Sequence, residues 1–388
     1  MGQSPPGNTY NRAGHGLPLI NGPTEFTDRS PIKIQWTTSP ARTCEPGDLL
    51  ICVRGSSTGR VNYADDVYAI GRGVAAIRAK DANDTSYLSY RVIAAVAEIL
   101  AAAAGSTFPS VDGASFRRIP IPLPDPDEQV AISTALADVD RLIESLDALI
   151  AKKRAIKQAT MQQLLTGKTR LPGFSSKWEL RRIGDMGNCL MTGSNPRSHL
   201  GTDDPVQYVH YGDVHAHPSP VLDVQSCTLP TIEPNLLGSA AALEDGDLVM
   251  VDASEDMVGV GKSVEVVGVN GLRVVAGLHT LLLRGLTDAW APGFKAYLQF
   301  IPAFRTALQR VATGISVYAT SKSQLLDVTL QLPKVEEQSA IAEVLRDMDD
   351  EIDALQRRRA KTAAIKQGMM QQLLTGRIRL VATAEEIH

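Results

Sequence analysis

The chain contains one long segment twice, and this repeat constrains its architecture more than any other feature. Residues 123–171 read LPDPDEQVAISTALADVDRLIESLDALIAKKRAIKQATMQQLLTGKTRL, and residues 332–380 read LPKVEEQSAIAEVLRDMDDEIDALQRRRAKTAAIKQGMMQQLLTGRIRL. The segments align without a gap at a constant offset of 209 residues, and about half of their positions are identical. This period lies far beyond the roughly 20–50 residues of solenoid repeats. The chain is therefore predicted to have two similar halves, each a variable region followed by the same module.

The repeated module is predicted to be a long helix that pairs with its own second copy. Apolar residues recur in alternating steps of four and three at Ile132, Leu136, Val139, Ile143, Leu146 and Ile150, and again at Ile341, Leu345, Met348, Ile352 and Leu355. This spacing places a narrow apolar seam on one helix face, as in a coiled coil. A helix from Glu128 to Thr166 would be about 58 Å long, and Gly167 and Gly376 would end the two copies. Two unrelated core helices are the alternative, but the identity also covers positions outside the seam.

The two variable regions resemble each other more faintly. The matching segments are 46–51 with 245–250, 69–78 with 275–284, and 87–90 with 297–300. Their order predicts strand, loop, strand and helix in both regions, which is a mixed α/β domain used twice. The predicted fold class is thus α/β (mixed α+β), with two similar globular domains and two long helices in a pseudo-two-fold internal repeat.

The predicted division follows from the repeat. It is 1–122 for the first domain, 123–171 for the first long helix, 172–331 for the second domain, 332–380 for the second long helix and 381–388 for a tail. The second half opens with residues 171–185, which have no match in the first half. We therefore expect the opening segment of the first domain to be missing, or the true start to lie upstream.

Composition indicates an ordinary soluble protein of two or three domains, with 388 residues, 44% of them hydrophobic and 21% charged. Its four cysteines, Cys44, Cys52, Cys189 and Cys227, form no CxxC pair, which favours a reducing cytoplasm. No signal peptide is visible, and the apolar run at 92–104 is too short to span a membrane. A net charge of −4 argues mildly against a free-standing nucleic-acid binder.

No motif predicts catalysis, cofactor binding or a metal site. The chain lacks the glycine-rich loop and NPPY-like tetrad of a methyltransferase. Residues 258–263 (VGVGKS) resemble a phosphate loop, but Asp256 stands where the motif needs glycine. His210, His215 and His217, with Asp213 among them, are conceivable metal ligands. This cluster has no counterpart in the first half. We therefore favour two other interpretations over a metal site: a surface loop, or histidines that contact DNA bases.

Binding groups are easier to find. Arginines and small polar residues follow strand ends, where they could donate hydrogen bonds to phosphates and base edges. The candidates are Arg54, Ser56, Thr58, Arg60, Arg72 and Thr107 in the first domain and Lys262, His279, Ser316, Tyr318 and Lys322 in the second. Basic runs at 152–157 and 357–361 fall on the repeated helices. The default interpretation of these runs is a solvated helix face. The more specific interpretation is contact with DNA or with another subunit.

These residues carry a family resemblance. The openings PDPDEQVAI and PKVEEQSAI, the ends QQLLTGK and QQLLTGR, LPGFSSKWEL, and the first-domain motifs GDLLICVRGSSTGRV and AIGRGVAAIR resemble the specificity subunit of a type I restriction–modification system. The resemblance covers nearly the whole chain, and the repeated helical module is the most specific part of it.

The resemblance implies an assembly role without catalysis. Each of two target-recognition domains would read one half of a split site in double-stranded DNA. The two long helices would pack antiparallel and would also dock two modification subunits, which would carry S-adenosylmethionine and the methylation chemistry. Restriction subunits with ATP-driven translocation, and the Mg²⁺ that goes with ATP, would join that complex. No cofactor is expected on this chain, and no membrane contact.

Two other functions stay open at the level of sequence. One is an enzyme, a methyltransferase or nuclease whose motifs cannot be read. The other is a tandem-domain scaffold that binds proteins only.

Overall fold

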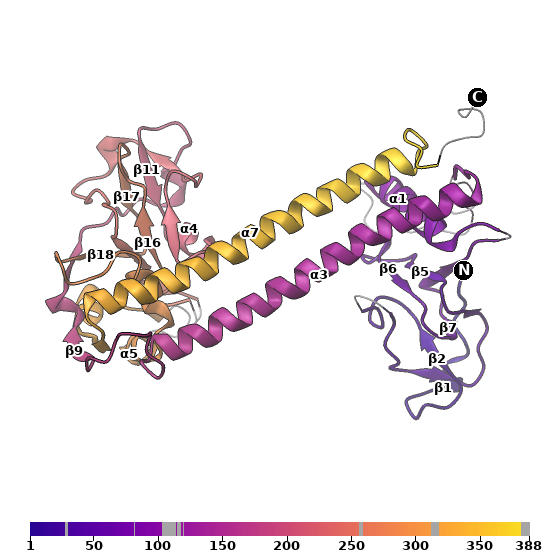
Figure 1. The fold of residues 1–388 in the computed structure, drawn as a ribbon, viewed down its shortest axis with the longest axis horizontal. Helices are drawn as coiled ribbons and strands as arrows, with labels where there is room; N and C mark the ends of the chain where they lie inside the picture. Colours follow the sequence, from indigo (N-terminus) through magenta and orange to yellow (C-terminus); the bar gives the residue numbers. More distant parts are fainter. Residues whose placement is uncertain are drawn as a thin grey trace. The chain divides into compact units, whose positions relative to one another are not determined.

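The computed structural model describes residues 1–27, 30–80, 82–102, 114, 118, 120–255, 259–311 and 318–381. The chain divides into two compact units, residues 1–147 with 357–388 and residues 148–356. Two helices of 39 residues, Pro126–Leu164 (α3) and Val335–Leu373 (α7), contribute to both units (Figure 1). Both bounds of α7 lie 209 residues after those of α3, so the repeat seen in sequence is also a repeat of structure.

The described part of the first unit contains two small sheets and helix Thr85–Ala102 (α1), beside its parts of α3 and α7. One sheet has the order β1-β3-β2-β7-β4, and the other has the order β6-β5-β8. The strands are Tyr10–Asn11 (β1), Leu17–Ile20 (β2), Trp36–Thr37 (β3), Thr43–Cys44 (β4), Leu49–Cys52 (β5), Val61–Tyr63 (β6), Tyr68–Ile70 (β7) and Val74–Ile77 (β8). Helix α1 starts where the Asp84 side chain accepts the N–H of Tyr87 at 2.6 Å, a typical helix cap.

The second unit is larger and also mixes sheets with short helices. Its main sheet has the order β10-β18-β14-β16-β12, and smaller sheets have the orders β13-β11-β17, β15-β19 and β20-β9. The strands are Glu179–Arg182 (β9), Gly187–Leu190 (β10), Val206–Val209 (β11), Val221–Asp223 (β12), Thr231–Ile232 (β13), Leu248–Val251 (β14), Ala253–Ser254 (β15), Ser263–Val267 (β16), Val274–Ala276 (β17), Thr280–Gly285 (β18), Tyr318–Ala319 (β19) and Thr329–Leu332 (β20). The α-helices are Tyr211–Ala216 (α4), Pro302–Val311 (α5) and Lys322–Asp327 (α6), and Lys295–Phe300 is the 3-10 helix η5.

The sheets of the two units pair in the same register. Strand β5 pairs antiparallel with β8, with Leu49 opposite Ile77, and β14 pairs antiparallel with β18, with Leu248 opposite Leu283. Strand β2 pairs parallel with β7, as β11 does with β17. These pairings agree with the matches of 46–51 to 245–250 and of 69–78 to 275–284. A mixed α/β domain is therefore used twice.

The units differ at one sheet edge. In the second unit β18 pairs with β10 on one side and β14 on the other, and β9 pairs with β20. In the first unit, among the residues that the structure describes, β8 pairs only with β5. Strand β9 comes from the part of the chain that has no match in the first half, and β10 follows shortly after that part. The expectation of a missing opening segment stays a prediction.

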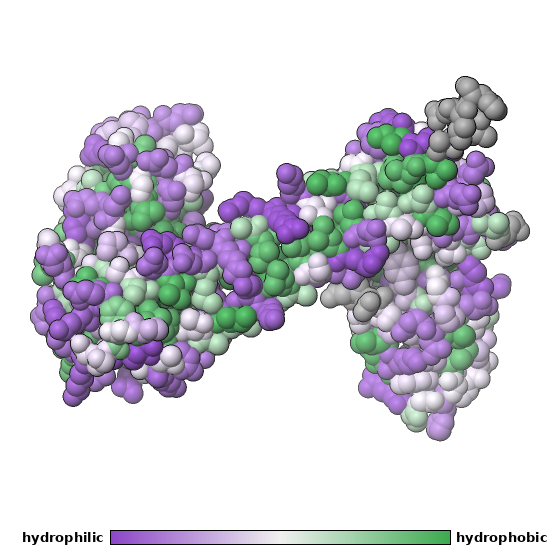
Figure 2. Space-filling view, viewed as in Figure 1, coloured by the Kyte–Doolittle hydropathy of each residue, from purple (hydrophilic) through white to green (hydrophobic). Residues whose placement is uncertain are grey.

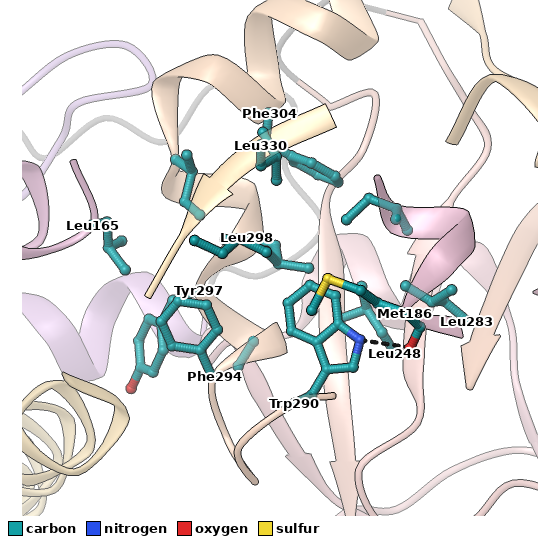
Figure 3. Close-up of a cluster of buried hydrophobic side chains, with 14 of the residues drawn as sticks. Leu165, Met186, Leu248, Leu283, Trp290, Phe294, Tyr297, Leu298, Phe304 and Leu330 are labelled. Atoms are coloured by element: carbon teal, nitrogen blue, oxygen red, sulfur yellow. Dashed lines mark hydrogen bonds between the residues drawn. The ribbon is translucent and has the colours of Figure 1, made fainter. Parts of the chain in front are cut away.

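The largest apolar core lies in the second unit and joins the sheets to the long helices (Figure 3). Trp290, Phe294 and Tyr297 pack there beside Met186, and the Trp290 indole N–H donates to the Met186 carbonyl at 3.0 Å. Leu165, directly after α3, belongs to the same cluster. The hydrogen bond from Trp290 to Met186 satisfies the indole donor, which would otherwise be costly to bury.

The predicted seam residues divide between helix pairing and domain packing. Ile132 and Leu136 pack against tyrosines of α1, whereas Ile341 and Leu345 lie in the core of the second unit. Leu146, Ile150 and Ile352 are also buried, and Val139, Ile143, Met348 and Leu355 are partly buried. The 3.5-residue pattern therefore serves two purposes, because the first turns of each helix support a domain.

One predicted correspondence is wrong by three residues. The sequence comparison matched Tyr87 to Tyr297, but the contacts match Tyr90 to Tyr297. Tyr90 Oη donates to Asp140 at 2.7 Å and Tyr297 Oη donates to Asp349 at 3.1 Å, and the two aspartates are 209 residues apart. Tyr87 and Tyr90 are about one helical turn apart, so sequence alone could not separate them. Tyr297 also lies in η5, not at the start of an α-helix.

Candidate nucleic-acid interface and helix junctions

Each unit places a loop at the end of two parallel strands. The Gly71 N–H donates to the carbonyl of Ile20 at 2.8 Å, and the Gly277 N–H donates to that of Val209 at 2.9 Å. The loop after β7 carries Arg72, and the loop after β17 carries His279. Because equivalent backbones hold different side chains, the two loops can contact different ligands from the same frame.

The first-unit candidates that the structure describes lie mainly on the surface. Arg54, Ser56, Arg60 and Arg72 are exposed. The Arg60 guanidinium donates to the Phe26 carbonyl at 3.1 Å, which ties it to its own domain. Arg54 and Arg72 are therefore better placed to contact an external phosphate.

Two further DNA-binding candidates of the first unit, Thr58 and Thr107, are not supported as surface contacts by the structure. The Thr58 hydroxyl donates to the Gly55 carbonyl at 2.7 Å and stabilises the turn between β5 and β6. Thr107 lies outside the described residues.

The two lysine candidates of the second unit have structural partners. Lys262 Nζ donates to the carbonyl of His215, and Lys322 Nζ donates to that of Leu190 at 2.9 Å. Each ammonium group fastens one element to another, so neither is a free cation. Tyr318, in β19, is half-buried, and Ser316 lies outside the described residues.

The histidine-rich segment 210–217 forms a capped helix. His210 Nδ1 accepts the N–H of Gly212 at 3.3 Å, and the Asp213 carboxylate accepts the N–H of His210 at 3.0 Å. Both groups thus satisfy the first turn of α4. In the described part of the chain no group of three or more histidines, cysteines and acids could hold a metal ion.

A cluster of rings at the start of α4 was only partly visible in sequence. The Tyr211 ring lies edge-on to His279, with centroids 5.6 Å apart, and contacts His210 at 4.3 Å between centroids. His279 Nδ1 lies 3.4 Å from Asp252 Oδ1. Sequence analysis singled out His279 but missed Tyr211 and Asp252, which have no motif and meet His279 only through the tertiary fold.

A matched arginine fork stabilises both sheets. Arg78 donates to both carboxylate oxygens of Asp48, at 2.5 and 2.8 Å, and Arg284 donates to both of Asp247, at 2.9 and 2.6 Å. Both aspartates are buried at 2% exposure, so each needs a bidentate cation. The repeated GDL motif of the sequence is therefore structural in both units.

A second matched set fixes each domain to the long helices. In the first unit Asp140 of α3 accepts from Tyr90 and pairs with Lys366 of α7 at 2.6 Å. In the second unit Asp349 of α7 accepts from Tyr297 and pairs with Lys157 of α3. Each lysine also lies over the ring of its tyrosine, 5.3 and 5.9 Å from the centroid.

The two sets have opposite helix order, since the aspartate lies on α3 in the first unit and on α7 in the second. Within each unit the two helices pair antiparallel, since Asp140 and Asp147 pair with Lys366 and Arg359 in the first, and Lys153 and Lys157 pair with Glu351 and Asp349 in the second. The basic run at 152–157 contributes further, because Lys153 pairs with Glu351 at 2.7 Å. Arg359, from the second run, pairs with Asp147 at 3.1 Å. Three residues of the basic runs, Lys153, Lys157 and Arg359, therefore pair with acids of the other helix.

The helix ends are tied by a third pair, Glu128 and Glu337, which are 2% and 3% exposed. The Glu337 carboxylate accepts two bonds from Arg170 at 2.5 Å and one from the Trp178 indole at 3.2 Å. The Glu128 carboxylate accepts the N–H groups of Leu380 and Val381, at 2.8 and 2.7 Å. Each glutamate lies in the first turn of its helix, where negative charge is favourable.

Large apolar side chains remain exposed on one face of α3. Leu142, Leu149 and Ile156 follow one another at seven-residue spacing and are 38%, 38% and 42% exposed. The positions 209 residues later on α7 are Glu351, Arg358 and Ile365, so only one of them is apolar. Hydrophobic surface is visible over the long helices in Figure 2. In the described residues no helix is both long and apolar enough to cross a membrane.

Comparison with known proteins agrees with this architecture. Residues 34–152 match the family model described as a type I restriction modification DNA specificity domain. The MjaX type I restriction enzyme specificity subunit of Methanocaldococcus jannaschii is 35% identical over 172 residues, 44% of this chain and 40% of that protein. The MjaVIII specificity subunit of the same organism is 22% identical over 357 residues, 86% of this chain and 79% of that protein.

A solved structure shows that the fold is shared. The type I restriction–modification S subunit from M. genitalium matches with a TM-score of 0.58 at 15% identity, covering 96% of this chain and 92% of that one. The repeated domains and helices of this chain are therefore an architecture seen in such subunits. The chain is thus similar in sequence to specificity subunits of type I restriction enzymes, and it shares the fold of a type I restriction–modification S subunit.

Proposed function

We propose that this chain is the non-catalytic DNA-specificity subunit of a type I restriction–modification complex. Each of its two domains would bind one half of a bipartite site in double-stranded DNA. The observation that carries the proposal is the matched pair of Tyr–Asp–Lys sets, which fasten two copies of one domain to an antiparallel helix pair. A protein that must hold two similar binding surfaces needs such a frame.

The proposed DNA contacts begin with the exposed arginines of the first domain. Arg54 and Arg72 would bind phosphates or base edges, with Ser56 beside them, because arginine and hydroxyl groups donate hydrogen bonds to both. In the second domain the loop after β17 has no arginine, and His279 and Tyr318 are the corresponding candidates. The different chemistry of the two surfaces supports two different half-sites.

The long helices would dock the other subunits. The stripe of Leu142, Leu149 and Ile156 on α3 supports this proposal, since an exposed apolar stripe at heptad spacing is the surface that a partner helix covers. Two modification subunits, and restriction subunits in addition, would complete the assembly. The net charge of −4 suits this division, because partners would then supply much of the phosphate contact that dominates DNA affinity.

We propose that this chain itself binds no cofactor or metal. S-adenosylmethionine would be held by the modification subunits, and ATP with Mg²⁺ by the restriction subunits. A cytoplasmic location fits the four cysteines, all of them unpaired. Burial raises the pKa of the Cys44 and Cys52 thiols to about 11, so these two stay protonated and inert.

Footprinting of the assembled complex tests the proposal. The complex should protect two patches of a duplex with an unprotected gap, and the isolated chain should bind DNA far more weakly. Arg72→Ala should weaken protection of one patch only, whereas Lys177→Ala, at an exposed residue after the first long helix, should change neither.

Three outcomes would oppose the proposal. Equal loss at both patches in the Arg72 variant would contradict two separate readers. S-adenosylmethionine binding or DNA cleavage by the purified chain alone would favour an enzyme. A complex that forms but protects no DNA would favour a protein-only scaffold.

A further inference from the structure

His279 has a backbone conformation that is unfavourable for a residue with a side chain. Its φ is +57°, in the left-handed region that residues other than glycine rarely adopt. The aligned residue of the first unit, Gly73, does not have a positive φ, so this conformation is particular to the second unit. A strained position occupied by a bulky residue often marks a functional side chain.

Two neighbours fix the imidazole ring. Asp252, directly after β14, approaches Nδ1 at 3.4 Å, and the Asp252 N–H donates to the His279 carbonyl at 3.2 Å. Tyr211, on α4, presents its ring at 85° to the imidazole. Each contact comes from a different element, so the ring has little freedom although its side chain is 52% exposed.

The Asp252 carboxylate determines which imidazole nitrogen of His279 is available to a ligand. An ionised carboxylate only accepts hydrogen bonds, so the nitrogen facing Asp252 carries a hydrogen. Asp252 Oδ1 is buried and has no hydrogen-bond partner among the described residues, and His279 Nδ1 at 3.4 Å is the group that pairs with it. His279 Nε2 likewise has no protein partner in the described part of the chain. The exposed ring therefore offers one oriented nitrogen to a ligand.

In the part of the chain that the structure describes, the surroundings do not supply a competing cation. Burial lowers the pKa of His210, which contacts the other side of Tyr211. Arg197 is held by Asp213 at 3.2 Å. His215 lies farther along α4, with its ring centroid 6.2 Å from that of Tyr211.

We propose that His279 is a base-reading residue of the second domain. Its Nε2 hydrogen-bonds to the edge of one base pair in the duplex, Asp252 sets the tautomer, and Tyr211 fixes the ring. Asp252 and Tyr211 are positioning residues. This inference rests on the proposed function and adds to it the group that reads part of one half-site.

Selection from a random-sequence duplex library tests the inference. The full chain is assembled with its modification subunits, bound duplexes are sequenced, and the preference at each base pair is compared between variants. His279→Ala should lower the preference at one base pair of one half-site by about tenfold, the usual effect of one mismatched contact. The other half-site should be unchanged. Asp252→Asn should weaken or alter the preference at that same base pair, because the amide can donate to Nδ1 and so change the tautomer.

His199→Ala is the matched control, since His199 is an exposed histidine of the same domain. It should select the parent sequence, and tryptophan fluorescence should show that all variants are folded. His279→Gln, which can also hydrogen-bond through its side chain, should recover part of the lost preference.

The outcomes separate the two levels of the argument. A folded His279→Ala variant that selects the parent sequence with parent preference overturns the inference and leaves the proposed function intact. Equal loss of preference across the whole half-site in a folded variant also overturns it. A parent complex that selects no sequence at all overturns the proposed function and this inference together.

Discussion

Replacing Asp349 with asparagine isolates the contribution of charge to the junction of the second unit. Asp349 accepts from the Tyr297 hydroxyl and pairs with Lys157. The side chains of Lys157 and Asp349 are only 13% and 23% exposed, so solvent screens this pair less than a surface pair. Asparagine keeps the shape and one acceptor oxygen. The variant therefore loses the ion pair and the charge on the acceptor of the tyrosine bond.

The expected cost is about 2 kcal/mol of unfolding free energy. A hydrogen bond to a charged group contributes roughly 1 kcal/mol more than one between neutral groups. The ion pair adds about 1 kcal/mol, the upper end of the range for exposed pairs. Urea unfolding followed by tryptophan fluorescence measures this loss, because Trp178 and Trp290 both lie in the second unit. Asp350→Asn, at the exposed neighbouring residue, is the control and should change stability by less than about 0.5 kcal/mol.

A double-mutant cycle with Tyr297→Phe completes the test. Burial raises the pKa of Tyr297, and the negative charge of Asp349 raises it further because it favours the protonated hydroxyl. Removing the hydroxyl should therefore cost about 1 kcal/mol more in the native protein than in the Asp349→Asn variant. Additive effects, or a loss below about 0.5 kcal/mol for Asp349→Asn alone, would refute the reasoning.

Two further predictions concern the core of the second unit. Lys295 and Glu265 form a buried pair, 6% and 1% exposed, in which burial lowers the lysine pKa and raises the glutamate pKa. Lys295→Met should cost about 3 kcal/mol at neutral pH, because it leaves a buried carboxylate without its cation. Stability curves against pH should show the deficit smallest below the ordinary glutamate pKa of 4.5 and growing as the pH rises through the raised pKa of folded Glu265; a deficit independent of pH would contradict this assignment. Gly277→Ala should cost about 3 kcal/mol in thermal unfolding, since its Cβ would lie 2.0 Å from the buried Tyr208 ring, whereas Gly212→Ala, where the nearest atom is 3.5 Å away, should leave the Tm nearly unchanged.

The sequence by itself determined the elements whose causes are local or repeated. The helix ends were nearly correct, because Gly167 and Gly376 adopt the left-handed conformation that stops a helix, with φ of +67° and +73°. The pairing of the two long helices followed from a seam that occurs twice at one offset, whereas their antiparallel direction was implied only by the family resemblance.

Only the tertiary structure decided which partner each charged or aromatic side chain finds. The sequence could not choose between Tyr87 and Tyr90, because both lie on one face of a helix and only contact with Asp140 distinguishes them. Asp252 and Tyr211 meet His279 from separate elements, and nothing in their local sequence indicates this. Periodicity reports which face of an element is apolar, which is a property of neighbouring residues. Pairing across elements depends on how the chain folds back on itself, and that information lies in contacts between residues far apart in sequence.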